Sequence, residues 1–170
     1  MADLIKQVIG ILDENSYVYN VHDDRIVIPF SGDSDDQEIG VEIRFFDADL
    51  PGMKSKVPVI HLRTDLLIGM PMEPESFSQA VMWTTNFNKK SFLLKAIVSV
   101  DESSGEDFGR VSLEADVLGT NLDAEELLIP IHGLASAGDA WDDQLASDLG
   151  GVTYAGALKA IRSAAPEVDS

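Results

Sequence analysis

The sequence predicts an α+β protein in which helices pack mainly on one face of an antiparallel β-sheet. Three observations lead to this fold class. The chain opens with an amphipathic helical repeat, contains two pairs of alternating segments typical of β-hairpins, and ends with a long apolar stripe at helical spacing. The predicted order is one helix, three or four strands, a second helix, two strands and a third helix.

The first helix is predicted within residues 2–15. Asp3 can cap its start and Asn15 suits its end. Between them the apolar residues recur every three or four positions, as one face of a helix requires. These residues are Leu4, Ile5, Val8, Ile9 and Leu12.

Residues 17–30 alternate in polarity on both sides of an Asp-Asp pair, which predicts a hairpin with a two-residue turn. Residues 39–48 continue the alternation, so a third strand should extend the hairpin into a meander. Pro29 lies in the middle strand. Because proline has no N–H to donate to a ladder, we expect a bulge or a break in pairing near it.

The acidic stretch Ser31–Gly40 is the connection that remains if Phe30 pairs with Val41. It resembles a calcium loop only superficially, because an EF-hand pattern would need a glycine where Glu38 lies and a glutamate where Arg44 lies. We therefore interpret it as a solvated connection and not as a metal site. It could shield the edge of the sheet or contact a basic partner.

The middle of the chain predicts a fourth strand within residues 54–69 and a second helix that begins at Pro74. The apolar spacing of that helix indicates that it buries Phe77, Ala80, Val81 and Thr84.

The clearest β-pattern lies in residues 92–102 and 109–119, which should form a second hairpin with Lys95 opposite Glu114. This register places the regularly alternating apolar residues on one face. The reverse face is only half polar, because Leu93, Ile97 and Leu118 also point to it. We expect a partner to bind on that face.

The third helix is predicted to begin at an acidic capping box made by Asp123 and Glu126. Its apolar stripe consists of Leu127, Ile131, Leu134, Trp141, Leu145 and Leu149. Pro130 and two glycines, Gly133 and Gly138, predict that the helix is kinked or split. We expect residues 1–150 to form a single domain, followed in residues 151–170 by a short helix and a loose tail.

The composition narrows the class of partner. A formal net charge of −18 over 170 residues disfavours nucleic acid and anionic membranes, which bind through Lys and Arg, while 45% hydrophobic residues argue against disorder. The absence of cysteine excludes disulfides and thiol catalysis. The first residues lack the features of a signal peptide, and no apolar run is long enough to span a bilayer. We therefore expect a cytoplasmic protein.

No catalytic, cofactor-binding or metal-binding residues are predicted. His22, His61 and His132 fall in different predicted elements and in no zinc-binding spacing. Glycine-rich phosphate loops and nucleophile elbows do not occur in the sequence. Pairs of carboxylates occur throughout a chain this acidic, so they carry no information about general acid–base catalysis. We therefore predict that the protein is not an enzyme and needs no cofactor.

The element order, the length, the acidity and the helical segment AEELLIPIHGLASAGDAWDDQL resemble the YbjN family, whose fold is similar to that of type III secretion chaperones. The resemblance covers residues Asp3 to Leu149 and includes Leu127, Leu134 and Trp141. It implies a small acidic cytoplasmic protein that dimerises and binds a segment of another protein, with no catalytic residues. Pro130, the acidic connection and the segment after Gly151 depart from the family's pattern.

Two hypotheses about function follow. The preferred one is a non-enzymatic protein-binding module of chaperone-like or regulatory type, acting as a cytoplasmic homodimer. Its partner-binding residues are predicted to be Leu93, Ile97, Leu118 and Trp141. The alternative is a small-ligand binder or an enzyme whose site the sequence does not reveal. An accessory domain within a larger complex is a third possibility.

Overall fold

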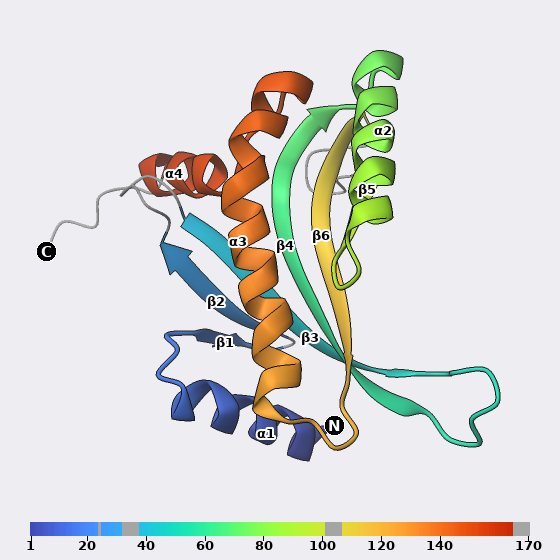
Figure 1. The fold of residues 1–170 in the computed structure, drawn as a ribbon. Coiled ribbons are helices and arrows are strands. Elements are labelled where there is room, and N and C mark those ends of the chain that lie inside the picture. Colours follow the sequence, from blue (N-terminus) through green and yellow to red (C-terminus); the bar gives the residue numbers. More distant parts are fainter. Residues whose placement is uncertain (24, 32–37, 101–106, 165–170) are drawn as a thin grey trace, which may run out of the picture.

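The protein is an α+β fold, as predicted, in which helices cover one face of an antiparallel sheet. The computed structural model describes residues 1–23, 25–31, 38–100 and 107–164. Within these residues six strands form one sheet in the order β1-β2-β3-β4-β6-β5 (Figure 1). The helices are α1 (Ala2–Glu14), α2 (Pro74–Lys90), α3 (Ala124–Leu149) and α4 (Tyr154–Ala164). The strands are β1 (Asn20–His22), β2 (Arg25–Ser31), β3 (Glu38–Ala48), β4 (Val57–Pro71), β5 (Lys95–Val100) and β6 (Phe108–Leu118).

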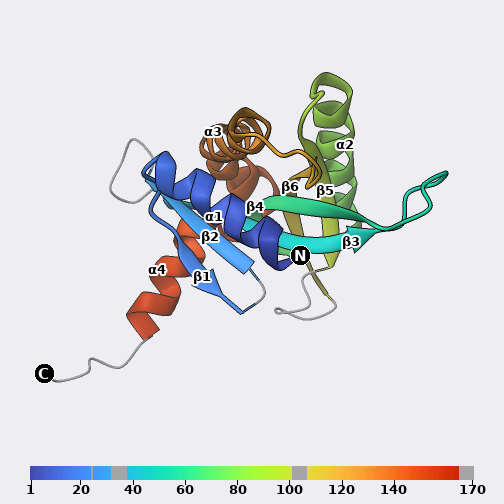
Figure 2. The same cartoon turned by 90° about the horizontal axis from the view of Figure 1, so that it is seen from below.

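The hydrophobic core lies between one face of the sheet and the helices α1, α2 and α3. Helix α3 runs across the middle of this face, over β3, β4 and β6 (Figure 1). Its apolar stripe meets the inward residues of every central strand, since strand side chains alternate between faces. Fully buried members of this core include Ile26, Val41, Ile43, Leu62, Leu113, Leu127, Ile131 and Leu134. Figure 2 shows α2 and α3 on one side of the sheet and α4 on the other.

The hairpin across the Asp-Asp pair is confirmed, because His22 pairs with Arg25 and Val21 with Ile26. Strand β1 has only three residues, however, and does not reach back to the tyrosines. Tyr19 donates a hydrogen bond to Asp13 at the end of α1, with an O···O distance of 2.8 Å. Such hydroxyl contacts hold the tyrosines beside the helices, so the sheet is shorter at this edge than the alternation predicted.

The β2–β3 register differs from the prediction by two residues. Phe30 pairs with Ile39 and Ser31 with Glu38, so the connection consists of residues 32–37 instead of Ser31–Gly40. A shift of two keeps every side chain on its face, and the hydrophobic pattern therefore cannot detect it. Asp33, Asp35 and Asp36, the acids that give this connection its superficial resemblance to a calcium loop, lie outside the described residues.

Of the two features expected near Pro29, the described residues show the break in pairing and not the bulge. Pro29 pairs regularly with Gly40 of β3, but β1 pairs only with residues 25–27 of β2 and so stops before it. At Pro29 the strand therefore has a neighbouring strand on one side only, which is where a sheet tolerates proline.

The second hairpin has the predicted register, with Lys95 opposite Glu114. Strand β5 forms an outer edge of the sheet, and helix α2 covers it. The side-chain amide of Asn88 pairs with both backbone groups of Ala96, accepting from its N–H at 2.7 Å and donating to its C=O at 2.9 Å. This pairing blocks part of an edge that could otherwise recruit another strand.

Helix α2 buries less than its spacing predicted. Ala80 and Thr84 are buried, but Phe77 and Val81 are exposed. The helix packs mainly against the edge strand β5, which offers it a narrow contact surface.

Helix α3 was predicted to be kinked or split, and it is not split, since one continuous helix runs from Ala124 to Leu149. Its capping box is confirmed, with reciprocal hydrogen bonds between Asp123 and Glu126. Gly138 lies close to β3: a Cβ there would be 3.1 and 3.2 Å from two carbons of Ile39. The glycine thus permits close helix–sheet packing, and the burial of the helix on the sheet outweighs the propensity cost of glycine and proline.

After α3 the chain crosses to the other face of the sheet. Gly150 and Gly151 adopt φ values of 73° and 93°, which favour glycine. A Cβ on Gly151 would lie 2.8 Å from the carbonyl oxygen of Ile68. Val152 then forms a two-hydrogen-bond bridge with Ile68, with both N···O distances 2.9 Å. This bridge leads the chain into α4.

None of the described helices combines the length and apolar character needed to cross a membrane.

One carboxyl group, that of Asp142 in α3, is buried with only 6% of the residue exposed. It accepts a hydrogen bond from the backbone N–H of Asp143 at 2.7 Å. Burial raises the pKa of Asp142, the hydrogen bond from Asp143 opposes this shift, and the negative charges of Asp143 and Asp139 add to it. Folding therefore shifts the protonation equilibrium of this carboxyl group toward the protonated form, relative to the unfolded chain.

Replacing Asp142 with asparagine should raise the free energy of unfolding at pH 7. The folded-state pKa lies above the unfolded value, so the ionised carboxyl destabilises the wild type once the pH exceeds the ordinary carboxyl range. The gain of Asp142→Asn should shrink as the pH falls toward that range. Urea denaturation of both proteins over a pH series measures this difference in the free energy of unfolding. The exposed neighbour supplies the control: an equal gain for Asp143→Asn would contradict the burial argument.

The two glycines of α3 should respond differently to alanine. A Cβ on Gly133 meets Leu94 at ordinary contact distance, 3.6 Å, so Gly133→Ala should stabilise the protein by about 1 kcal/mol through helix propensity. Gly138→Ala has the same propensity gain but crowds Ile39, and its net gain should be smaller. Denaturant unfolding of both variants checks this. Equal gains would show that β3 yields freely to α3.

Candidate functional site

An apolar groove lies where β6 runs past the start of β5. It has a volume of about 380 Å³, and we call it the β6 groove. Its apolar walls come from Leu93, Ala115, Val117, Leu118, Ile129 and Pro130. Three polypeptide segments therefore meet there: the residues before β5, the last four residues of β6 and the first turns of α3.

The groove exists because the β5–β6 ladder stops early. The last pair is Lys95 with Glu114, whereas β6 continues to Leu118 and pairs there with β4. Among the described residues no strand pairs with the other side of Ala115–Leu118. The chain before β5 turns instead, with the N–H of Leu94 donating to the hydroxyl of Ser91 at 3.1 Å. The end of β6 is thus an open sheet edge, which another strand can extend.

Large apolar side chains are exposed around this open edge. Leu118 is 52% exposed, Ile129 is 57% exposed, and Phe92 beside the groove is fully exposed. Single exposed apolar residues are common, but several around one groove mark an interaction surface. The apolar surface and the open backbone together suit an extended partner segment.

The charges of the β6 groove are of one sign. Asp116, Glu125 and Glu126 line it, and no lysine or arginine in the described chain does so. Asp116 lies 2.8 Å from Nδ1 of His61 on the neighbouring strand β4. A segment that enters this groove would meet apolar walls with an acidic rim, so electrostatics favours a partner with basic residues beside its apolar ones.

The structure separates the four residues predicted to bind a partner. Leu93 and Leu118 both line the β6 groove. Ile97 lies opposite Ser112 on the reverse face of β5 and does not line it. The prediction missed Ile129 and Pro130. Ile129 carried a usable signal, because it is an apolar residue outside the apolar stripe of α3.

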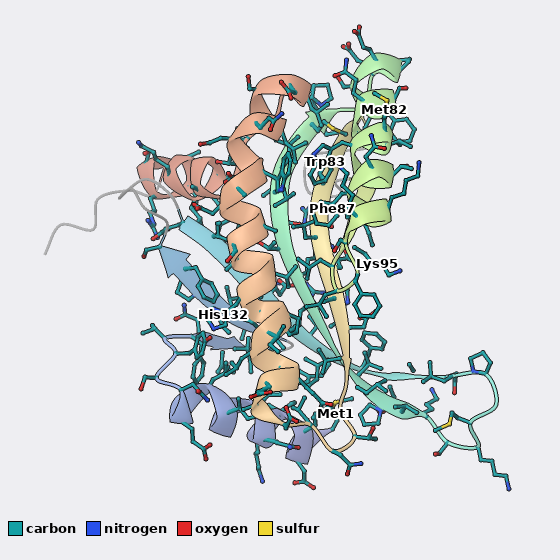
Figure 3. The ribbon with its side chains drawn as sticks, in the orientation of Figure 1. Met1, Met82, Trp83, Phe87, Lys95 and His132 are labelled. Atoms are coloured by element: carbon teal, nitrogen blue, oxygen red, sulfur yellow. The ribbon has the colours of Figure 1, made fainter. Side chains whose placement is uncertain are left out.

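Trp141 belongs to an aromatic cluster between α3 and α2, away from the other three residues. Its ring meets that of Trp83 edge-to-face at a centroid distance of 5.8 Å, and Trp83 stacks on Phe87 at 5.3 Å. Figure 3 shows Trp83 and Phe87 in the space between the two helices. These aromatic contacts hold α2 against α3. Trp141 also lines a hollow of about 380 Å³ there with Trp83 and Phe87, so its role in partner binding stays a prediction.

A second hollow lies on the reverse face of the sheet, where α4 forms one wall. Its volume is about 540 Å³, and we call it the arginine pocket, because all five arginines of the chain line it. They are Arg25, Arg44, Arg63, Arg110 and Arg162. The arginines come from five different elements, β2, β3, β4, β6 and α4, and no sequence motif connects them.

The three histidines do not meet. His61 lies near Asp116 and Glu114 on the reverse face, His22 lines the arginine pocket, and Nε2 of His132 is 2.6 Å from the hydroxyl of Tyr17. Within the part of the chain that the structure describes, no three His, Asp or Glu side chains are grouped closely enough to hold a metal ion.

Comparison with known proteins supports the fold alone. No protein-family model matches the sequence, and neither does any curated protein. Among solved structures, this one is similar to that of YbjN from E. coli, a protein described as a candidate transcription regulator. The match has a TM-score of 0.57 and 9% sequence identity, and covers 84% of this chain and 90% of YbjN. The chain therefore has a YbjN-like α+β fold.

Proposed function

We propose that the protein is a non-enzymatic protein-binding module of chaperone-like or regulatory type, which receives an extended segment of a partner in the β6 groove. The observation that carries this proposal is the open edge of Ala115–Leu118 next to exposed Leu118 and Ile129. Backbone hydrogen bonds to such an edge provide affinity, and pockets for alternate side chains provide specificity. The description of YbjN as a candidate regulator agrees with a regulatory role.

The partner segment should contain alternating apolar residues flanked by lysine or arginine. Alternate side chains of an added strand would point toward the groove, since strand side chains have a period of two. The basic residues would face Asp116, Glu125 and Glu126, and a chain with a net charge of −18 would attract them at long range.

We also propose that the protein is a cytoplasmic homodimer, as its resemblance to the YbjN family implies. Helix α2 provides a surface for the second copy. Its outward residues Phe77, Val81 and Met82 are apolar and exposed, Met82 to 61%. This surface is separate from the β6 groove, so dimerisation and partner binding would be compatible.

Selection of random peptides displayed on phage should enrich sequences with alternating apolar residues and flanking basic residues. Leu118→Glu should weaken binding of a selected peptide by about tenfold or more, since it removes an apolar contact and buries a charge. Val18→Glu changes an apolar residue outside the groove that is even more exposed, to 75%, and should leave affinity unchanged. Fluorescence anisotropy measures both. Peptides that bind wild type and Leu118→Glu equally would refute the site.

Sedimentation equilibrium should show a dimer that Met82→Glu weakens by about tenfold or more, because the substitution brings a charge into an apolar contact. Gln79→Glu adds the same charge at an exposed polar position of the same helix and should have little effect. A wild-type protein that is monomeric at micromolar concentration would contradict the proposed dimer. The proposal that the β6 groove binds a partner segment would be unaffected.

A further inference from the structure

We propose that the arginine pocket binds a small molecule that carries a phosphate monoester. This site is on the opposite face of the sheet from the aromatic cluster and does not share residues with the β6 groove. It therefore goes beyond the protein-binding function and does not depend on it.

The first argument is the separation of arginine from lysine. Every arginine of the chain lines this pocket, and none of the lysines, all of which the structure describes, does so. Both residue types neutralise acidic neighbours, but only arginine presents a planar fork that matches the geometry of an oxyanion. The separation indicates that the pocket uses this geometry and not positive charge alone.

The second argument is the charge balance. Among the described residues, five guanidinium groups line the pocket with three carboxylates, those of Glu38, Glu42 and Asp65. These lining residues carry a surplus of two positive charges in a protein with a net charge of −18. A phosphate monoester carries a charge of about −1.5 to −2 at pH 7, which balances the surplus; a single carboxylate would leave it half balanced.

The third argument is how the carboxylates hold the arginines. Two of the three carboxylates, Glu42 and Asp65, each serve two guanidinium groups and so orient both, whereas Glu38 pairs with Arg162. Glu42 binds Arg44 and lies 3.4 Å from Nε of Arg25. Asp65 is 2.8 Å from Arg63 and 3.0 Å from Arg110.

This sharing leaves donor capacity on Arg25 and Arg63, since a guanidinium group has five N–H bonds. Nε of Arg25 is buried, and its ion pair with Glu42 does not have hydrogen-bond geometry. No described residue accepts a hydrogen bond from this N–H. Nη2 of Arg63 is buried as well, and its 2.8 Å ion pair with Oδ1 of Asp65 also lacks hydrogen-bond geometry. A phosphate, which offers three strong acceptor oxygens, is chemically suited to such donors.

Helix α4 shapes the pocket for the organic part of the ligand. Tyr154 packs so closely on β3 that a Cβ on Gly40 would be 2.6 Å from its ring. Arg162 closes the wall through an ion pair with Glu38 at 3.0 Å. Leu158 and Pro29 add apolar surface. A volume of about 540 Å³ lies within the range of small-molecule sites.

Titration with glycerol 3-phosphate tests the proposal. The Nε–Hε cross-peaks of Arg25 and Arg63 should shift saturably in NMR spectra at constant ionic strength. Arg25→Gln should weaken binding by about tenfold or more, because a charge-assisted hydrogen bond contributes about 1.5–3 kcal/mol. Lys95→Gln removes the same charge on the same face outside the pocket and should leave affinity unchanged. Arg162→Gln provides a second variant, since Arg162 has a side chain 67% exposed and its loss should not prevent folding.

Three results would overturn the proposal. Shifts that do not saturate, or that Lys95→Gln reduces as much as Arg25→Gln, would mean diffuse charge attraction only. Saturable binding of citrate without binding of glycerol 3-phosphate would assign the pocket to carboxylates. Arginine-dependent binding of a short DNA duplex in place of glycerol 3-phosphate would assign it to nucleic acid. The peptide affinity of Arg25→Gln should equal that of wild type, which keeps this test separate from that of the β6 groove.

Discussion

The packing of α3 on one face of the sheet is the constraint on which the rest of the structure depends. One helix covers β3, β4 and β6 together, and its buried stripe runs from Leu127 to Leu149. The contact is close because Gly138 lets the helix backbone approach Ile39. The burial of apolar area stabilises the protein, and α3 buries an apolar stripe along its length. This stabilisation outweighs the cost of Pro130, so the helix stays continuous.

Covering one face so completely leaves the other face for polar residues. The reverse residues of β2, β3, β4 and β6 include four of the five arginines and the carboxylates that hold them. Such a face needs no second layer, because antiparallel sheets can present one side to water. Of the helices that the structure describes, only α4 returns to it, through the turn at Gly150 and Gly151. The C-terminal segment thus converts an ionic sheet face into a walled pocket.

Each of the two candidate sites forms where one element covers only part of its neighbour. The β6 groove forms because β5 is shorter than its partner strand, and the arginine pocket forms because α4 covers only part of the reverse face. The YbjN-like fold does not by itself specify either site, since one fold supports many functions and the site residues decide among them. The described residues of the two sites also differ in the sign of their charge: those of the groove are acidic, and those of the pocket carry a surplus of positive charge.

Local patterns in the sequence determined most of the elements. The α3 capping box, the Asp-Asp hairpin and the pairing of Lys95 with Glu114 were all predictable, because each depends on periodicity or turn chemistry within a few residues. The groove was predictable in part. Leu93 and Leu118 could be found as apolar residues on a polar face, and Ile129 as an apolar residue off its helix stripe.

Only the tertiary structure decided the rest. It set the β2–β3 register, which differs by an even number of residues that alternation cannot detect, and it made Gly138 a packing residue instead of a helix breaker. Above all, it placed the arginines around one pocket. Arg25 and Arg162 are far apart in the chain, and both line this pocket only because α4 crosses to the reverse face. No local sequence pattern encodes this arrangement of arginines, because it depends on where the whole helix α4 packs.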